Sequence, residues 1–313
     1  MPDKPAAEVI FDEALVRRLV TGQATALGLE FAALPLVRVA AGWDCEVWRL
    51  GDALAVRLPR RALAAPLVRS EQRALPVLGP RLAAIGVASP MPLLTGSPGA
   101  GFPWPWSIVA WIDGCRGLDV PRADRRGWAN LLAAALGEVH IPAPTDAPVN
   151  PVRGVPLAER ADAVEARLAR LRSEAALSVR QNARLTAIWR DGLDAAPWTG
   201  APLWIHGDLH PGNLIADGGS LHGIIDFGDV TSGDPAYDLA VAWLAFDADG
   251  RDAFRRATAG RYDEDAWRRA RAWAAAVAVM LLSHSDDAPA YAELAAATLL
   301  ELEADPASLA DGY

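Results

Sequence analysis

The sequence predicts an α+β fold made of two lobes, a strand-rich N-terminal lobe and a mainly helical C-terminal lobe. The chain has 313 residues, which is more than one minimal hydrophobic core requires. Short apolar runs bounded by turn residues, a pattern typical of strands, are concentrated before residue 113. Apolar residues at helical spacing dominate after it. We therefore assign residues 1–112 to the first lobe and residues 113–313 to the second, with a hinge at Asp113-Gly114.

The N-terminal lobe is expected to begin with a helix and to continue as a sheet. Residues 12–28 start with acidic residues, keep helical apolar spacing and end with a glycine. The turn Gly51-Asp52 has the two-residue length of a β-hairpin connection. After the first helix, the expected elements are strands at 36–41, 46–50 and 53–58, a helix that ends near residue 78, and strands at 90–94 and 107–112.

The C-terminal lobe is expected to be a set of amphipathic helices with one interruption. That interruption is residues 203–228, where short strands alternate with tight turns. A Pro- and Asn-rich loop is expected at 141–151. Helices are expected at 122–140, 157–171, 179–193, 235–248, 252–259, 263–282 and 288–302.

Composition excludes several classes of protein. Hydrophobic residues make up 52% of the chain and charged residues 22%, which indicates a folded globular protein. The net charge of −9 argues against a nucleic-acid partner, which requires a basic face, and is compatible with a cationic ligand. The longest apolar run, 272–282, is shorter than the roughly 20 residues that span a bilayer, so no membrane partner is expected. The first residues lack the pattern of a secretory signal, and we expect a cytoplasmic protein.

Two residue types that are scarce in this chain exclude further classes of site. Cys45 and Cys115 are the only cysteines, so neither a disulfide framework nor a cysteine-based zinc site is expected. Lys4 is the only lysine, and it lies in the N-terminal tail. A Walker-A nucleotide site needs the sequence G-K-[ST], so that class is excluded. The chain also lacks the G-x-S-x-G turn of a serine hydrolase.

Residues 206–228 carry the most specific chemical signal. The segment contains His-Gly-Asp-Leu-His-Pro-Gly-Asn followed, after a short apolar stretch, by Asp-Phe-Gly. Asp208, Asn213 and Asp226 reproduce the spacing found in enzymes that transfer phosphate to a hydroxyl. In that chemistry one carboxylate orients the hydroxyl and takes its proton. An amide oxygen and a second carboxylate hold Mg²⁺ on the nucleotide phosphates.

Simpler interpretations of these residues are less favourable. Asp and Asn beside Gly and Pro are common in turns, but turn chemistry does not explain the joint match. His206 and His210 stand four apart, as in some zinc sites. Nearby glycine and proline disfavour the helix that such a site uses, and the glutamate of H-E-x-x-H is missing. We expect His206 to brace the loop and His210 to do the same or to contact substrate.

Three stretches, 204–213, 224–229 and 233–240, resemble the aminoglycoside phosphotransferase family, a branch of the protein-kinase-like fold. Members of that family transfer the γ-phosphate of ATP, or in some cases GTP, to a hydroxyl of an antibiotic or small metabolite. The resemblance covers the catalytic core closely and nearly the whole chain in outline. It implies a bilobal protein-kinase-like fold.

The resemblance also implies roles for individual residues. Asp208 would be the catalytic base, and Asn213 and Asp226 the magnesium ligands. Asp234 and Asp238 would be buried acids that brace the catalytic segment.

In the N-terminal lobe the chain departs from the family pattern at one position. The third strand should carry a lysine that is paired with a helix glutamate, and here Arg57 and Glu71 occupy these positions. Arginine binds phosphate bidentately, so we favour a phosphate role for Arg57 over a surface charge on an edge strand. Four more positions are implied in nucleotide binding: Gly42 and Trp43 in the loop over the nucleotide, and the backbone of Ala110 and Ile112 at the adenine edge.

These observations predict a phosphotransferase that uses ATP or GTP and Mg²⁺ to phosphorylate a small-molecule hydroxyl. The residues of the motif, Asn213 and Asp226-Phe227-Gly228, favour an aminoglycoside-type acceptor over a macrolide or another metabolite. Seven acidic residues late in the chain are expected to lie on the solvated surface, and some of them could surround a polyamine substrate: Asp247, Asp249, Asp263, Glu264, Asp265, Asp286 and Asp287. The missing lysine leaves open a nucleotide-binding pseudokinase. Phosphorylation of proteins is disfavoured because the interval between Asp226 and residue 235 is too short for an activation segment.

Overall fold

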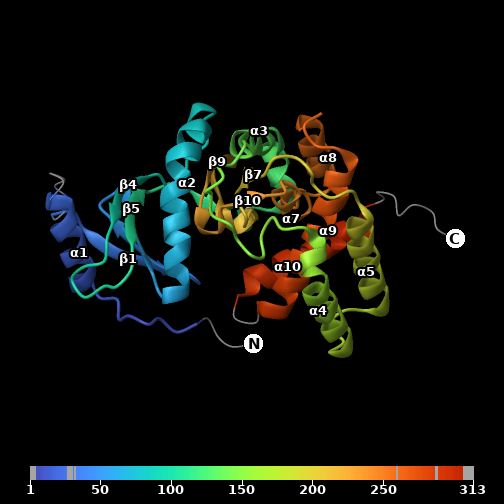
Figure 1. The fold of residues 1–313 in the computed structure, drawn as a ribbon, viewed down its shortest axis with the longest axis horizontal. Helices are drawn as coiled ribbons and strands as arrows, with labels where there is room; N and C mark the ends of the chain where they lie inside the picture. Colours follow the sequence, from blue (N-terminus) through green and yellow to red (C-terminus); the bar gives the residue numbers. More distant parts are fainter. Residues whose placement is uncertain (1–4, 27–30, 32, 259, 286–287, 306–313) are drawn as a thin grey trace. The chain divides into compact units, whose positions relative to one another are not determined.

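The computed structural model describes residues 5–26, 31, 33–258, 260–285 and 288–305. Their contacts divide the chain into two compact units. Figure 1 labels the helices and strands that belong to them. Of the described residues, 5–113 and 223–230 form what we call the N-terminal unit, and 114–222 and 231–305 form the C-terminal unit. Asp226 therefore packs with the N-terminal unit, although it lies far along the sequence.

The N-terminal unit is built on a five-stranded antiparallel sheet with strand order β1-β2-β3-β5-β4. Gly51 adopts a φ of 61°, which glycine reaches without steric penalty, and it allows the tight β2–β3 turn that the sequence predicted. The predicted strands are confirmed, with ends that differ by a few residues. They are β1 (Leu36–Ala41), β2 (Cys45–Leu50), β3 (Leu54–Pro59), β4 (Pro92–Gly96) and β5 (Trp106–Ala110).

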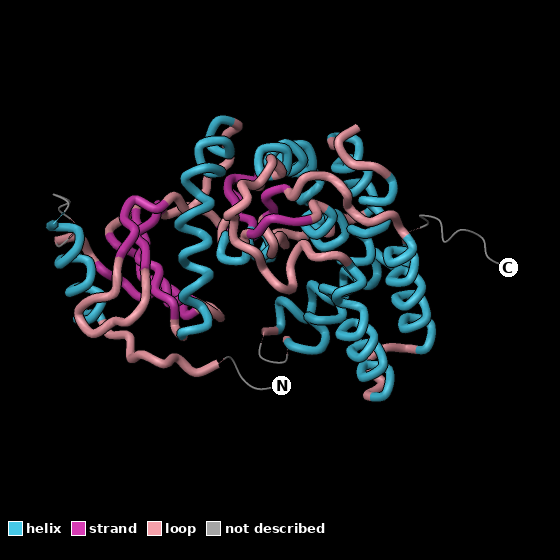
Figure 2. Tube along the Cα trace, in the orientation of Figure 1, coloured by secondary structure: helices cyan, strands magenta, loops and turns pink. Residues whose placement is uncertain are grey.

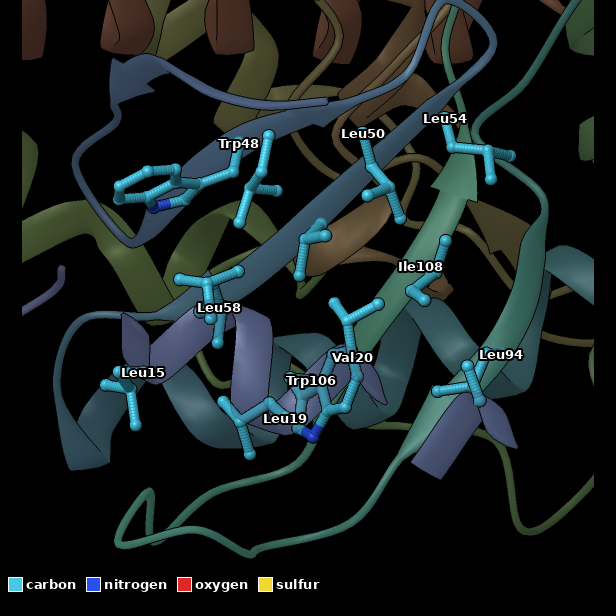
Figure 3. Close-up of a cluster of buried hydrophobic side chains, with 14 of the residues drawn as sticks. Leu15, Leu19, Val20, Trp48, Leu50, Leu54, Leu58, Leu94, Trp106 and Ile108 are labelled. Carbon is cyan, nitrogen blue, oxygen red and sulfur yellow. The ribbon is translucent and has the colours of Figure 1, made fainter. Parts of the chain in front are cut away.

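Two helices pack against this sheet, α1 (Glu13–Ala26) and α2 (Ala65–Ala84), and Figure 1 shows strands of the sheet between them. Side chains alternate between the two faces of a strand. Leu54 and Leu58 of β3 join the apolar cluster that α1 completes with Leu15 and Leu19 (Figure 3). Arg57 lies between them in register and reaches the opposite face, where it meets α2.

The helix α2 is longer than the sequence predicted. The expected end near residue 78 was wrong, because the helix continues to Ala84 with Pro76 and Pro80 inside it. A proline removes its own backbone donor and weakens a helix. Here Leu78 and Leu82 are fully buried, and this burial maintains the helix beyond the prolines.

The C-terminal unit is mainly helical, as the cyan parts of the tube in Figure 2 show. Together with the sheet of the N-terminal unit, these helices confirm the predicted α+β class. The long helix α9 packs against α4, α5, α6 and α10. Its N-terminus is capped by Asp263, whose Oδ1 accepts the Ala266 N–H at 2.7 Å. The α-helices are α3 (Ala129–Val139), α4 (Ala161–Ser173), α5 (Val179–Asp194), α6 (Ala236–Leu239), α7 (Val241–Ala245), α8 (Ala248–Ala257), α9 (Glu264–His284) and α10 (Pro289–Ala304).

Several of the predicted helices were placed inaccurately. In the expected helix 122–140, residues Arg122–Trp128 form 3-10 turns, and the α-helix α3 begins only at Ala129. The expected helix 235–248 is two short helices, α6 and α7. The next helix, α8, begins earlier than residue 252 because Asp247 caps it, with Oδ1 accepting the Gly250 N–H at 3.0 Å. Residues 27, 28, 259, 286 and 287, which the sequence analysis included in a helix or an acidic group, lie outside the described residues.

Short strands flank the segment 206–228, which carries the candidate site residues. β7 (Leu203–Ile205) pairs antiparallel with β10 (Thr231–Gly233), and residues 206–213 follow β7 directly. β6 (Cys115–Arg116), β8 (Leu214–Asp217) and β9 (Ser220–Ile224) form a second small sheet, and β9 leads into Asp226. Within the described ranges, no helix has the length and apolar character needed to cross a membrane.

Candidate active site

Backbone hydrogen bonds to one buried carboxylate hold the start of the loop 206–213, the candidate catalytic loop. Asp238 has no exposed surface, and its Oδ2 accepts the His206 N–H at 2.6 Å while its Oδ1 accepts the Gly207 N–H at 3.0 Å. The Asp208 N–H then donates to Nδ1 of His206 at 3.2 Å. The chain turns at Gly207 with a φ of 81°, a conformation that favours glycine. His206 and Asp238 therefore brace the loop from both sides.

The side chain of Asp208 meets three polar groups of the C-terminal unit. Asn213 donates from Nδ2 to the Asp208 backbone oxygen at 2.8 Å and to Oδ2 at 3.2 Å. Nε2 of His210 lies 3.5 Å from Oδ2, and Nη2 of Arg153 lies 3.4 Å from Oδ1. The carboxylate remains 28% exposed, so a substrate hydroxyl can still reach it.

These neighbours keep Asp208 ionised. Burial acts to raise the pKa of Asp208, but interactions with His210, then Arg153 and His206, outweigh it and hold the pKa well below its usual range. A carboxylate in this state orients a hydroxyl and accepts its proton as the oxygen attacks phosphorus.

A longer polar network supports Asp238. Nε2 of His140 lies 3.0 Å from Oδ2 of Asp238, and Nδ1 of His140 lies 2.6 Å from the Tyr262 hydroxyl. Asp234 is also buried, and its Oδ2 accepts Nε of Arg269 at 2.7 Å. Both acids thus occupy buried positions, and Asp238 is the one that contacts the catalytic loop.

In the N-terminal unit, Arg57 joins two carboxylates. Its Nη2 lies 2.9 Å from Oδ1 of Asp226 and 3.4 Å from Oε2 of Glu71 on α2. The same Glu71 oxygen accepts the Phe227 N–H at 3.2 Å, which ties Asp226-Phe227 to α2. Asp226 has a φ of 64°, and a non-glycine residue in this left-handed region often marks a functional site.

Burial and charge act against each other in this trio. Burial acts to lower the pKa of Arg57, but Glu71 and Asp226 raise it above its usual value, so the guanidinium stays charged. Burial raises the pKa of Glu71, against the opposing effect of Arg57. Nε of Arg57 is buried without a hydrogen-bond partner among the described residues. This unused donor fits an additional oxygen acceptor such as a phosphate.

The Gly42–Trp43 turn between β1 and β2 is held by a backbone hydrogen bond to β2 and by an arginine that follows β3. The Gly42 N–H donates to the Cys45 carbonyl at 2.8 Å, and Nη1 of Arg60 donates to the Gly42 carbonyl at 3.2 Å. Trp43 is 44% exposed at the tip. The turn is therefore ordered, with an aromatic side chain available to a ligand.

Ala110 and Ile112 lie at the end of β5 and just beyond it. The Ala110 N–H donates to the Met91 carbonyl at 3.2 Å, so this donor is already engaged. Ile112 packs close to Gly223, where an added Cβ would approach Cγ2 of Ile112 to 3.1 Å. Of the two, Ile112 is the better candidate for a backbone contact with a base.

Asn213 and Asp226 have the chemistry of magnesium ligands. The amide nitrogen of Asn213 is engaged by Asp208, and those hydrogen bonds do not use its amide oxygen. The Asp226 side chain is 53% exposed, and its Oδ1 meets Arg57. In the part of the chain that the structure describes, no three His, Cys, Asp or Glu side chains gather to hold a metal ion. Mg²⁺ commonly takes one or two protein oxygens and completes its shell with phosphate and water, and each of these two side chains can supply one such oxygen.

The predicted residues fall into two groups. Asp208 and Asn213 meet in the C-terminal unit, and Arg57, Glu71 and Asp226 meet in the N-terminal unit. Sequence reasoning missed three side chains of the catalytic surroundings: Arg153, His140 and Tyr262. None belongs to a recognisable motif. The sole signal for Arg153 was its place next to Gly154 in a loop rich in proline.

Comparison with solved structures finds the same fold in small-molecule phosphotransferases. The GDP complex of aminoglycoside 2'-phosphotransferase-IIIa is 18% identical, covers 94% of this chain and 99% of its own, and has a TM-score of 0.65. Macrolide 2'-phosphotransferase MphH from Brachybacterium faecium is 21% identical, covers 90% and 97%, and has a TM-score of 0.60. Macrolide 2'-phosphotransferase type I is 22% identical, covers 94% and 98%, and has a TM-score of 0.58.

These likenesses confirm the protein-kinase-like fold. Comparison with curated protein sequences finds no significant match. Comparison with protein families matches residues 35–273 to the phosphotransferase enzyme family that the sequence motifs resemble. Because the match spans most of the chain and includes both halves of the catalytic motif, the chain belongs to this phosphotransferase enzyme family.

Proposed function

We propose that the protein transfers the γ-phosphate of ATP or GTP to a hydroxyl of a small molecule. The observation that carries the proposal is the surroundings of Asp208, an ionised and partly exposed carboxylate held by Asn213 in a braced loop. That arrangement serves to orient a hydroxyl for attack on phosphorus. We retain the functional division of the lobes, with nucleotide binding in the first and acceptor binding in the second.

The chain's own residues have distinct tasks in this reaction. Asp208 orients the acceptor hydroxyl and receives its proton. Arg57 binds a phosphate oxygen with its charged fork, and Glu71 keeps that fork in place. Asn213 and Asp226 would hold Mg²⁺, and the bound ion would neutralise part of the phosphate charge.

The structural relatives support nucleotide and small-molecule binding. One is described as a complex with GDP and kanamycin, and another as a ternary complex with streptomycin and ATP. Sequence motifs favoured an aminoglycoside-type acceptor over a macrolide. The relatives include enzymes of both kinds, so we propose a small-molecule hydroxyl acceptor without restricting it to either.

A turnover screen tests the proposal. The protein is incubated with Mg-ATP or Mg-GTP and a panel of hydroxyl compounds, and release of nucleoside diphosphate is recorded with mass spectrometry of the acceptor. We expect at least one acceptor to stimulate release and to gain one phosphate. Tight binding of Mg-nucleotide without turnover on any acceptor would instead favour the pseudokinase alternative.

Replacement of Arg57 should weaken triphosphate binding. In Arg57→Met the charged fork is lost, and charge-assisted hydrogen bonds are worth about 1.5–3 kcal/mol, so the Kd of Mg-ATP should rise about 10- to 100-fold. Arg57→Lys keeps the charge but loses the bidentate guanidinium, so its Kd for Mg-ATP should lie between those of the wild type and Arg57→Met. Calorimetric titration with Mg-ATP measures the effect.

Two controls separate a phosphate role from a structural one. Adenosine, which lacks phosphate, should bind wild type and Arg57→Met equally. Arg18→Met removes an exposed arginine of α1 and should leave Mg-ATP binding unchanged. An equal loss for adenosine and Mg-ATP would show that Arg57 supports the lobe and does not bind phosphate.

A further inference from the structure

The cation beside Asp208 is fixed in place by contacts on several sides. Arg153 donates from Nη1 to the Tyr237 hydroxyl, and its guanidinium lies over the Tyr237 ring at 5.6 Å from the centroid. Its side chain is 18% exposed. The guanidinium of Arg153 is therefore an ordered charge with a small accessible surface, unlike that of a mobile surface arginine.

The loop that carries Arg153 is also fixed. Gly154 has a φ of 64°, and a Cβ added there would lie 2.4 Å from Cδ1 of Ile205 in β7. The Gly154 carbonyl accepts the Asp234 N–H at 3.0 Å. The loop that carries Arg153 therefore packs on the side chain of Ile205, the last residue of β7, which lies three residues before Asp208 in the chain.

Basic side chains lie on both oxygens of the Asp208 carboxylate. Nη2 of Arg153 lies 3.4 Å from Oδ1, and Nε2 of His210 lies 3.5 Å from Oδ2. Tyr291 packs edge-on against the His210 ring, with centroids 5.4 Å apart, and adds an aromatic group without charge. An acceptor hydroxyl that approaches Asp208 therefore also meets the guanidinium of Arg153, which lies 3.4 Å from the same carboxylate.

The acidic residues that could have attracted a polyamine are engaged elsewhere. Asp247 and Asp249 both pair with Arg126, each at 2.8 Å. Asp263 caps α9. The other two acidic residues that the structure describes form ion pairs at the surface: Glu264 with Arg255, and Asp265 with Arg268.

We propose that Arg153 is a specificity-determining residue of the acceptor site, where its fixed charge selects uncharged or anionic hydroxyl compounds over polycationic ones. The proposal rests on the proposed function, because it takes Asp208 as the group that receives the acceptor hydroxyl. Arg153 repels ammonium groups close to the acceptor hydroxyl, since like charges at short range oppose binding. A carboxylate or neutral group at the same place is accepted.

Matched acceptor pairs test this directly. Each pair is an amine-bearing hydroxyl compound, kanamycin among them, and its fully N-acetylated form, which keeps the scaffold and removes the charges. For the wild type, kcat/KM and the calorimetric Kd should favour the N-acetylated form by about 10-fold or more. Arg153→Gln should reduce this preference by about 10-fold, mainly through KM, and Arg153→Lys should retain it.

Controls make each outcome decisive. Arg170→Gln removes an exposed arginine of the same unit and should leave the preference intact, and thermal melts confirm that each variant folds. A wild type that prefers the amine-bearing form, or an unchanged ratio in Arg153→Gln, would refute the charge selection while leaving phosphotransfer standing. Binding that favours the N-acetylated form without any turnover would refute phosphotransfer and support the charge selection.

Discussion

Asp208→Ala is expected to lose phosphoryl transfer, by about 10²–10⁴-fold in kcat, while it still binds Mg-nucleotide. The variant removes the carboxylate that orients the acceptor hydroxyl and receives its proton. Arg57 and Glu71, which we propose to serve the nucleotide phosphates, belong to the other compact unit and remain intact. Steady-state turnover and Mg-ATP titration on the same preparation measure the two effects.

An exposed aspartate provides the matched control. Asp217 ends β8 on the surface of the same unit, and Asp217→Ala should leave kcat unchanged. Normal turnover in Asp208→Ala would show that another group receives the proton. Loss of nucleotide binding in parallel with turnover would show that Asp208 holds the site together and does not act on the acceptor.

The low pKa of Asp208 adds a consequence for this experiment. Because His210, Arg153 and His206 hold the carboxylate ionised despite its burial, its protonation should not limit the rate between about pH 5 and 8. The defect of Asp208→Ala should therefore be similar across that range.

Local patterns in the sequence were sufficient for most of the fold. The strands at 36–58 and the long C-terminal helices follow from periodicity and turn residues, which act over a few neighbours. The length of α2 could not be predicted from such local patterns. Prolines at 76 and 80 argue locally for an end, and only the burial of Leu78 and Leu82 in the assembled core overrides them.

The candidate site shows the same division. Asp208, Asn213 and Asp226 were visible because the proposed chemistry requires particular residue types at fixed spacing. Arg153 was not visible, because its place beside Asp208 depends on how the loop around Gly154 packs on β7. His140 lies 98 residues from Asp238 in the chain, and such a pairing is set by tertiary structure.

Asp238→Ala should be the most destabilising change in the C-terminal unit among those considered. It leaves the His206 and Gly207 N–H groups and Nε2 of His140 without their acceptor in a fully buried site. Removal of one partner from a buried charged network destabilises by about 3–5 kcal/mol. Urea denaturation measures this loss, and kcat should fall with it because the backbone that precedes Asp208 is released.

Asp238→Asn is the more conservative probe, and Asp265→Asn is its control. The asparagine keeps one acceptor oxygen but turns an amide N–H toward a backbone donor, so a large part of the destabilisation should remain. Asp265 lies in a surface pair with Arg268, and its replacement should change stability by less than about 1 kcal/mol. Equal stability of Asp238→Asn and Asp265→Asn would contradict a bracing role for Asp238.

Acid pH distinguishes an ionised brace from a packing role. Burial acts to raise the pKa of Asp238, but its hydrogen bond and charge interaction with His140, followed by His206 and Gly207, hold the pKa below the usual 3.8. Its contribution to stability is therefore complete above about pH 4 and is lost as the pH falls through the folded-state pKa. The difference between wild type and Asp238→Asn should stay constant between about pH 5 and 8 and narrow below pH 4. A difference that persisted unchanged into strong acid would mean that Asp238 stabilises the loop by shape and not by its charge.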